Sequence, residues 1–357
     1  MDEQGENSGK GVRAMPDTTS RRVIAVEEHF ATTEYWNRTA ELPAFSGEDA
    51  ERVYSRSFIA NEFISKRLTD LRTRLDEMDS AGVDVSVLSL NPPGVQLWSD
   101  AATATSLARE MNDVLADIVA AHPTRFAGLA AVAPQEPAAA AEEIRRATGT
   151  LGFGGVLIGS HTGGRYLDEP ECEPILAALE ETDSTLYLHP RMPSPQMLEP
   201  YKPYGLQQAI WGFQAEASTH ALRLILSGAF DRHPNLRVVL GHLGEGLPFW
   251  LWRIDNMHAK AYAWARDVLD MVGLQLTPSE YFQRNIWITT SGMCDHDALN
   301  YCLTKVGAER VLFAVDYPYE DSGVATEFLS KAELDDEQHA MVSHRNAERL
   351  FRVPPLT

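Results

Sequence analysis

Short apolar runs rich in Val, Ile and Leu recur along the chain, and each precedes a longer segment with the apolar period of an amphipathic helix. Such alternation is typical of a parallel β-sheet covered by helices. In two helical segments the apolar face is plain: Leu68, Leu71, Leu75 and Met78 mark one, and Met111, Leu115, Ile118 and Val119 mark the other. The pattern predicts eight strands, at residues 22–26, 83–89, 126–134, 155–160, 185–189, 236–242, 285–291 and 311–316.

Eight strands that alternate with helices predict an α/β fold of the TIM (β/α)8 barrel type. A doubly wound open sheet alternates in the same way, but no G-x-G-x-x-G follows the first strand and the sequence has no P-loop motif. No repeat of solenoid period and no Pro-, Gly- or Ser-rich linker divides the chain. We therefore expect one barrel domain over residues 21–357, preceded by a disordered tail at residues 1–20.

Two of the expected connections are too long for plain turns. One covers residues 31–61, and the other, residues 190–204, is rich in proline. Both follow strand ends, and in a barrel the carboxyl ends of the strands form the face that carries the active site. We expect these two segments to act as lids or as subunit contacts.

The charge balance limits the partners that the protein can have. Its 51 acidic side chains exceed its 31 basic ones, and the formal net charge is −20. Such a field repels phosphate backbones and anionic headgroups, so we expect neither nucleic acid nor a membrane as a partner. An anionic substrate would need local positive charge, from a metal ion or an arginine.

Cysteine usage bears on the cellular compartment. Cys172, Cys294 and Cys302 are widely spaced and form no C-x-x-C pair, which is typical of a protein in a reducing cytoplasm. The polar first twenty residues lack the apolar core of a signal peptide. We expect a cytoplasmic protein.

Candidate metal ligands lie at the ends of three predicted strands. The two-residue period of an extended chain places Glu27 and His29 on one side of the first strand and Glu28 on the other. The fifth strand ends in His189, and the eighth ends in Asp316. Each alone has an ordinary explanation, such as a chance E-x-H pair, a histidine that caps the sheet or a turn aspartate. Together, two carboxylates and two imidazoles at one end of a barrel predict a site for one divalent ion, Zn²⁺ or Mn²⁺.

A second pair of candidates follows the sixth strand. His242 ends that strand and Glu245 comes three residues later, so one turn of helix would bring them together. A carboxylate that holds one imidazole nitrogen fixes the tautomer of a proton-transfer group. A glycine-rich helix start explains Glu245 alone, but it leaves His242 unexplained.

Two further side chains are candidates for substrate binding. Arg253, on the next predicted helix, could hold a substrate carboxylate through two hydrogen bonds, although a structural ion pair is the common role of such an arginine. His161, just past the fourth strand, is either a substrate-binding or site-supporting group or an ordinary loop histidine.

These residues fall within motifs that resemble the amidohydrolase-related decarboxylases, which include γ-resorcylate (2,6-dihydroxybenzoate) decarboxylase, salicylate decarboxylase and aminocarboxymuconate-semialdehyde decarboxylase. The likeness runs from Arg22 to about Phe351. Its blocks, in order, are E-E-H-F (27–30), M-D-S-A-G-V-D (78–84), L-S-L-N (88–91), Y-L-H-P-R (187–191), G-x-F-D-R-H-P-N-L (228–236), G-H-L-G-E-G-L-P-F (241–249), W-R-I-D-N (252–256), I-T-T-S-G (288–292) and D-Y-P-Y-E (316–320).

The resemblance implies a role for each candidate. It implicates Arg253 in substrate binding and places the His242 and Glu245 pair beside a single metal ion, whose ligands would be Glu27, His29, His189 and Asp316. Binuclear members of the superfamily commonly bridge their metals with a carbamylated lysine on strand four, whereas the six lysines here lie away from the predicted strands. The E-x-H motif resembles the resorcylate branch, and residues 158–161 resemble the aminocarboxymuconate branch.

The implied reaction is the non-oxidative decarboxylation of a small hydroxylated aromatic acid, similar to 2,6-dihydroxybenzoate or salicylate. We expect Asp316 to protonate the ring carbon before CO₂ leaves, while His242 and Glu245 manage protons nearby. A metal-dependent hydrolase of a lactone or amide is the alternative, and a barrel that only binds a metal or ligand is a third class. Since the family usually forms dimers or tetramers, we expect a homodimer or homotetramer.

Overall fold

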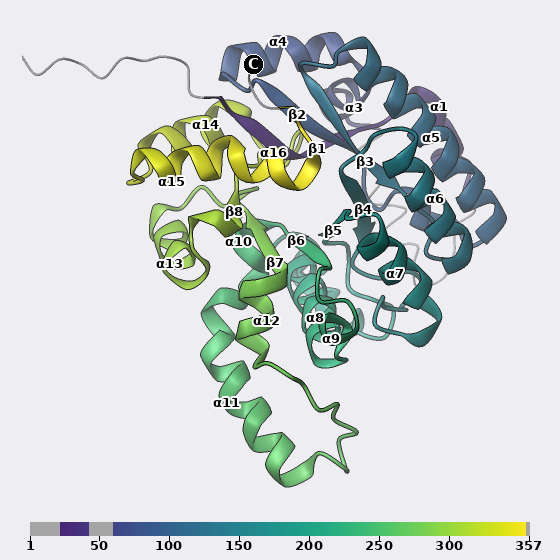
Figure 1. The fold of residues 1–357 in the computed structure, drawn as a ribbon. Helices are drawn as coiled ribbons and strands as arrows, with labels where there is room; N and C mark the ends of the chain where they lie inside the picture. The colour runs from purple at the N-terminus through teal and green to yellow at the C-terminus, as the bar shows by residue number, and fades with distance from the viewer. Residues whose placement is uncertain (1–21, 43–59, 355–357) are drawn as a thin grey trace, which may run out of the picture.

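The computed structural model describes residues 22–42 and 60–354, in which eight parallel strands follow the order of the sequence around a barrel (Figure 1). This confirms the predicted TIM-barrel class. The predicted tail lies outside the described residues, so the division into tail and single domain stays a prediction. The strands are β1 (Ile24–Phe30), β2 (Val85–Leu90), β3 (Phe126–Ala131), β4 (Gly155–Gly159), β5 (Thr185–His189), β6 (Arg237–Leu240), β7 (Ile286–Thr289) and β8 (Val311–Leu312).

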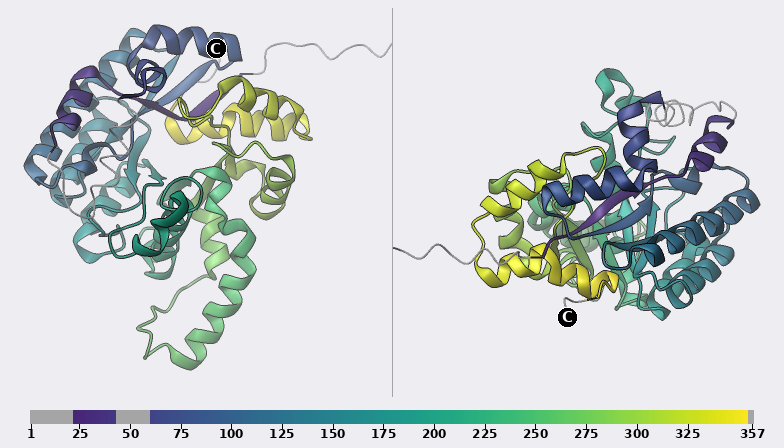
Figure 2. Two further views of the ribbon diagram at one scale, coloured as in Figure 1. Left: turned by 180° about the vertical axis from the view of Figure 1, so that it is seen from behind. Right: turned by 90° about the horizontal axis from the view of Figure 1, so that it is seen from above.

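Helices surround the strands and form the outer layer of the barrel (Figures 1 and 2). In the described part of the chain, none of them combines the length and apolar character needed to cross a membrane. The helices are α1 (Thr33–Ala40), α3 (Glu62–Thr69), α4 (Leu71–Ala81), α5 (Ala101–Ala121), α6 (Pro137–Gly149), α7 (Glu173–Glu181), α8 (Gly212–Leu226), α9 (Ala229–Arg232), α10 (His242–Glu245), α11 (Leu247–Ala265), α12 (Pro278–Asn285), α13 (His296–Val306), α14 (Ser322–Lys331), α15 (Asp336–Ala340) and α16 (Asn346–Phe351).

Several strands end at other residues than the apolar runs predict. β1 extends to Phe30, past the predicted end at residue 26, whereas β8 ends at Leu312 although the apolar run continues to Val315. The chain leaves the sheet there because its N–H groups bond elsewhere, and that of Val315 donates to the side chain of Glu28 (3.1 Å). β3, β6 and β7 also end before their apolar runs do. Asp316 therefore stands on a turn beyond its strand.

The apolar core has two parts, one inside the barrel and one between the strands and the outer helices. Helix α16 packs against the inner part at the amino ends of the strands, where the Thr185 hydroxyl donates to the Leu350 carbonyl (3.0 Å). That end of the barrel is thereby closed, which leaves the carboxyl ends for a site. The strand side chains of the inner core are Ile24, Val26, Val85, Val87, Leu129, Tyr187, Val239, Trp287 and Leu312.

Helices α4 and α5 confirm the two predicted helical segments, with one correction. The first apolar face is divided between α3 and α4, because Asp70 caps the N-terminus of α4. Within α4 the buried residues are Arg74 and Met78, whereas Leu71 and Leu75 are only half-buried. An arginine thus occupies a core position of this helix.

Helix α11 and the chain after it project from the body of the barrel (Figures 1 and 2). Leu247, Pro248 and Leu251 in its first turns are buried, and the rest of the helix is largely exposed.

The proline-rich segment 190–204 forms the short helical turns η3 (Glu199–Tyr201) and η4 (Pro203–Gly205) at its end. Part of segment 31–61 lies outside the described residues, and the lid or contact roles of both segments stay predictions.

Gly155, at the start of β4, tests how closely the barrel backbone is packed. A methyl group there would lie 2.2 Å from the backbone oxygen of Thr185 on β5, so Gly155→Ala must push two paired strands apart. We expect the free energy of unfolding, measured in urea, to fall by about 1–3 kcal/mol. Gly149→Ala is the control, because a methyl group at the end of α6 meets no atom within 4 Å. Equal unfolding midpoints for the two variants would contradict this account.

Candidate metal centre

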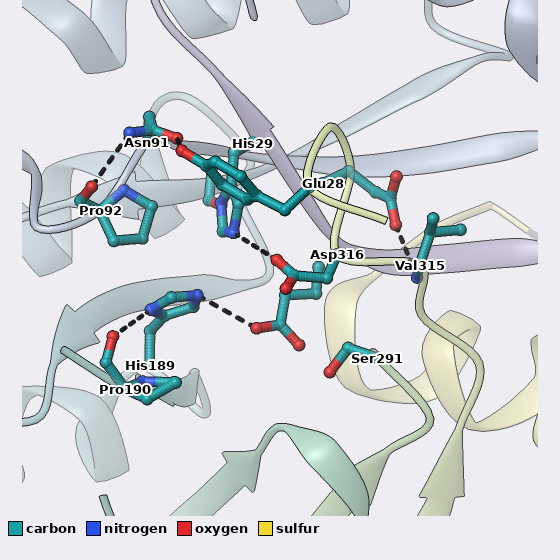
Figure 3. A network of polar contacts seen from close by, with 12 residues as sticks. Glu28, His29, Asn91, Pro92, His189, Pro190, Ser291, Val315 and Asp316 are labelled. Atoms are coloured by element: carbon teal, nitrogen blue, oxygen red, sulfur yellow. Dashed lines mark hydrogen bonds and ion pairs between the residues drawn. The ribbon is translucent and has the colours of Figure 1, made fainter. Parts of the chain in front are cut away.

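Four of the predicted side chains meet at the carboxyl end of the barrel. Glu27 and His29 come from β1, His189 from the end of β5 and Asp316 from the turn after β8. One ligand atom from each lies within 4.8 Å of those from the other three. Figure 3 shows His29, His189 and Asp316 turned toward one another. The first three residues are buried, and Asp316 is half-buried.

Neighbouring groups fix the far atom of each buried ligand. The Tyr187 hydroxyl donates to Oε2 of Glu27. Nδ1 of His29 lies 3.0 Å from the Ser89 hydroxyl, and Nδ1 of His189 lies 2.6 Å from the carbonyl oxygen of its neighbour Pro190. Such partners orient metal ligands and set the tautomer of a ligating histidine.

The near atoms of the ligands face one another. The carbonyl of Pro190 can only accept, so Nδ1 of His189 carries a proton, and the neutral form of the ring, which is the form that binds metals, presents its lone pair at Nε2. That lone pair lies 3.1 Å from Oε1 of Glu27, while Nε2 of His29 lies 3.4 Å from Oδ1 of Asp316.

A divalent cation fits this arrangement. Oε1 of Glu27, Nε2 of His29 and Nε2 of His189 are buried, and none has a hydrogen-bond partner within the described residues. A cation placed among them would satisfy all three atoms at once. Two carboxylates and two imidazoles are a donor set that suits Zn²⁺ or Mn²⁺.

Local charges keep the centre in the form that a cation requires. Burial alone would raise the pKa of Glu27, but the positive charge of His242 and the contact with His189 outweigh it and lower the pKa to about 2. Burial is likewise outweighed at Asp316, whose pKa falls below its usual range because of its contacts with His242 and His29. Burial lowers the pKa of His29, which favours the neutral imidazole that binds metals.

His242 and Glu245 lie beside this cluster, and the turn that joins them is left-handed. Nδ1 of His242 is 2.9 Å from Oε1 of Glu245, and its Nε2 is 3.8 Å from Oδ2 of Asp316. The predicted spacing of one turn holds, but the φ angles of His242, Leu243 and Glu245 are 51°, 53° and 55°. The expectation of an ordinary helical turn is therefore wrong. Each such residue costs about 1–2 kcal/mol in a left-handed conformation, so the surrounding contacts must hold the turn.

The His242 side chain is held as a charged imidazolium. Burial lowers its pKa, but the negative charges of Glu245 and Glu27 and the contact with Asp316 outweigh burial and raise the pKa well above its usual value. Its backbone N–H donates to the hydroxyl of Ser291 (3.1 Å). The ring thus holds a proton on the side of the cluster where Asp316 lies.

The two predicted substrate-binding residues are placed differently. His161 is buried, with Nε2 3.0 Å from the Met192 carbonyl and Nδ1 accepting from the Gly164 N–H at 3.3 Å. Both ring nitrogens thus bond to the local backbone, as in an ordinary loop histidine, and burial lowers its pKa to about 2. Arg253 is exposed on α11 and outside the four-residue cluster. Substrate binding by either residue stays a prediction.

Sequence reasoning missed Tyr187 and Ser89, which support the ligands. Tyr187 lies two residues before His189, so the two-residue period that pairs Glu27 with His29 would also have placed it in the barrel. Ser89 pairs with His29 across the β1–β2 ladder. That partnership depends on a strand register which the sequence pattern does not give.

Comparison with known proteins assigns the chain to a family and identifies relatives. Residues 65–353 match the family described as amidohydrolase. The γ-resorcylate decarboxylase of Rhodococcus jostii (strain RHA1) is 38% identical over 341 residues, which cover 92% of this chain and 98% of that protein.

Solved structures agree in sequence and in fold. The 5-carboxyvanillate decarboxylase of Sphingomonas paucimobilis is 44% identical, with a TM-score of 0.89 over 94% of this chain and 100% of that one. The enzyme of the same name from Novosphingobium aromaticivorans, solved with manganese and 4-hydroxy-3-methoxy-5-nitrobenzoic acid, is 37% identical with a TM-score of 0.89 and covers 93% of this chain and 96% of that one. The three relatives named here, which the chain resembles over nearly its full length, are decarboxylases. The chain therefore belongs to the amidohydrolase family.

Proposed function

We propose that this protein catalyses the non-oxidative, metal-dependent decarboxylation of a small aromatic acid with a hydroxyl group ortho to the carboxylate. The observation that carries the proposal is the group of buried, unpartnered atoms of Glu27, His29 and His189, which converge beside Asp316. The decarboxylases among the relatives support the reaction class. They do not favour the alternative of a lactone or amide hydrolase.

Manganese is the metal that we propose, because it is the ion bound by a related decarboxylase of known structure. Zn²⁺, which also suits the donor set, remains the second choice. When bound, a divalent ion supplies a Lewis acid that fixes the substrate carboxylate and its neighbouring hydroxyl in one geometry.

Asp316 is the side chain that we assign to protonation of the ring. An aryl carboxylate cannot simply lose CO₂, because the electron pair left behind would lie in the ring plane without conjugation. Protonation of the ring carbon that bears the carboxylate removes this difficulty, and the ortho hydroxyl stabilises the dearomatised ring. The carbon–carbon bond then breaks, its electrons restore the aromatic ring, and CO₂ leaves.

His242 and Glu245 are the second group of side chains that we assign to the handling of protons. The low pKa of Asp316 keeps it ionised, yet the His242 imidazolium stands 3.8 Å from its Oδ2. Glu245 holds the other ring nitrogen and so directs Nε2 toward Asp316. The raised pKa of His242 and the lowered pKa of Asp316 both oppose transfer from one to the other. We therefore assign to Asp316 a proton from the substrate hydroxyl, and to His242 and Glu245 the handling of protons on the substrate.

The ortho-hydroxy carboxylate is the substrate feature common to these relatives. γ-Resorcylate has a hydroxyl on each side of its carboxylate, and 5-carboxyvanillate has one beside its 5-carboxylate. The ligand bound to the Novosphingobium enzyme carries a nitro group beside its hydroxyl, in the position of that carboxylate. Arg253 remains our candidate for binding a carboxylate, as the family resemblance implies, and His161 is the weaker candidate.

We also propose that the protein is a homodimer or homotetramer, joined through the projecting arm formed by residues 252–277. Trp264 and Val268 on this arm are 78% and 86% exposed. Aromatic and aliphatic side chains of this size are typical of the buried centre of an interface between subunits. The exposed apolar residues of the arm are Trp252, Met257, Trp264, Val268, Leu269 and Val272.

The reaction can be tested with protein that has been freed of metal by a chelator and then reloaded with Mn²⁺ or Zn²⁺. With 2,6-dihydroxybenzoate, salicylate or 5-carboxyvanillate as substrate, we expect CO₂ release that depends on the added metal. Without a cation held by the four ligand atoms, the centre has no positive partner for the substrate carboxylate. Benzoate, which lacks the ortho hydroxyl, is the matched control. Metal-independent CO₂ release, or hydrolysis of lactones or amides with no CO₂ from any acid, would refute the proposal.

Asp316→Asn tests the proton donor, because asparagine keeps the size of the side chain but cannot deliver a proton to the ring. We expect kcat to fall by about 10²–10⁴-fold, while calorimetry still detects binding of metal and substrate. Asp321→Asn is the control on the same loop, since Asp321 caps α14 and asparagine caps a helix equally well. Retained turnover in the metal-loaded Asp316→Asn protein would remove Asp316 from this role.

Sedimentation of a Trp264→Ser/Val268→Ser variant tests the arm. Loss of two apolar side chains that the proposed interface would bury should weaken self-association by about 30-fold or more. The variant should therefore sediment as a smaller species than the parent protein at the same concentration. Val324→Ser, which changes an exposed valine on α14, should leave the assembly unchanged. A parent protein that is monomeric, or an assembly that tolerates the double substitution, would refute an interface at the arm.

A further inference from the structure

The seam between β1 and β8 holds three of the four candidate ligands. β8 has only two residues, and among the described residues the seam is joined by one isolated bridge between Glu28 and Tyr317. Two backbone hydrogen bonds accompany it, from Asp316 N–H to Glu27 O (3.1 Å) and from His29 N–H to Tyr317 O (2.8 Å). The spacing of the ligands on the two strands therefore depends on very few contacts.

The side chain of Glu28 adds a further bond to this seam. Its Oε1 accepts the N–H of Val315 at 3.1 Å, in a place where a longer β8 would use a backbone acceptor. Glu28 is 2% exposed, and Figure 3 shows it turned away from His29 and toward Val315. It thus anchors the residue just before Asp316.

Arg74 of α4 contacts the same seam from behind. It is 1% exposed, and its Nη2 donates to the backbone carbonyl of His29. Its guanidinium stacks on the ring of Tyr317, 4.3 Å from the centroid, and its positive charge partly opposes the effect of burial, which raises the pKa of Glu28 to about 8. Arg74 therefore contacts the backbone of His29 and the side chain of Tyr317, the residue that follows Asp316.

Stability alone gives little reason to bury these two polar side chains. Ionisable groups lose so much hydration on burial that apolar side chains of similar volume are often as stable or more so. In this protein the pair lies directly behind the candidate metal centre, with a contact to the backbone of each strand. We propose that Glu28 and Arg74 are positioning residues, which fix His29 and Asp316 at the separation that one divalent ion requires. This inference rests on the proposed metal-dependent function.

The test removes the Glu28 side chain alone and together with that of Arg74, and it measures metal binding apart from turnover. The variants are Glu28→Met, Glu28→Gln and the pair Glu28→Met/Arg74→Met. The double variant leaves no unpaired buried charge, so it should unfold in urea near the parent midpoint. We still expect its Mn²⁺ affinity, measured by chelator competition, to fall by about 10–100-fold. Glu28→Gln should bind Mn²⁺ more tightly than Glu28→Met, because it keeps an acceptor for Val315.

Two further measurements separate positioning from a merely structural role. The visible spectrum of bound Co²⁺ reports ligand geometry, and it should change in the double variant. Arg74→Lys retains the charge but loses the planar fork, so it decides the matter if the methionine variants fail to fold. Its Co²⁺ spectrum should also change. Glu143→Met is the control, since Glu143 is a buried carboxylate that pairs with Asn112 and Arg146 away from the centre. It should lower stability but not metal affinity.

The outcomes separate this inference from the proposed function. Folded double variant or Arg74→Lys protein with parent-like Mn²⁺ affinity and an unchanged Co²⁺ spectrum would overturn the positioning role alone. Parent protein that binds no Mn²⁺, Zn²⁺ or Co²⁺ would overturn the metal-dependent function and this inference with it.

Discussion

A lone pair on His189 faces a lone pair on Glu27 across 3.1 Å, in a place that water does not reach. When the imidazole is neutral, as metal binding requires, this contact is unfavourable without a cation between the two atoms, because two buried acceptors then lose their hydration and gain no partner. The groups around the centre make the contact hard to avoid. The Pro190 carbonyl fixes the tautomer of His189, and the Tyr187 hydroxyl occupies the other oxygen of Glu27. The fold thus prepares a site that one positive ion completes.

Preparation of the site extends to the backbone. Asp316 has a φ angle of 76°, and the turn from His242 to Glu245 is left-handed. These conformations are unfavourable for residues with a side chain, and proteins tend to retain them at functional sites. Two groups assigned to proton transfer therefore stand on strained turns, beyond the ends of β6 and β8.

Features of the fold and site that depend on neighbouring residues could be predicted from the sequence, whereas those that depend on residues far apart in the chain could not. Local periodicity placed the eight strands, and it put Glu27 and His29 on one side of β1, because the period of an extended chain is a property of neighbouring residues. Strand ends were less accurate. After Leu312 the N–H groups of the chain bond outside the β7–β8 ladder, and that of Val315 bonds to the side chain of Glu28, which is 287 positions distant in the sequence. No local pattern contains that partner.

The other features that local patterns do not reveal have equally specific causes. A spacing of three residues brings His242 to Glu245 in a turn of either hand, so sequence spacing cannot distinguish the two. Arg74 lies among the leucines of α4, where composition predicts an exposed arginine on the outer face. Its burial depends on a carbonyl of β1 and the ring of Tyr317, both supplied by distant parts of the chain. Arg253, predicted from its motif, is exposed on the projecting helix α11 and lies outside the four-residue cluster.

The negative charge of the protein makes a bound cation important for the binding of an anionic substrate. The chain has a net charge of −20, and its centre gathers the carboxylates of Glu27, Asp316 and Glu245 around the single imidazolium of His242. An aromatic carboxylate that approached this group alone would meet repulsion from the whole molecule and from the site itself. A divalent ion removes the local excess of negative charge and gives the substrate a positive partner. An ion that relieves the facing lone pairs would thus also make the site attractive to an anion.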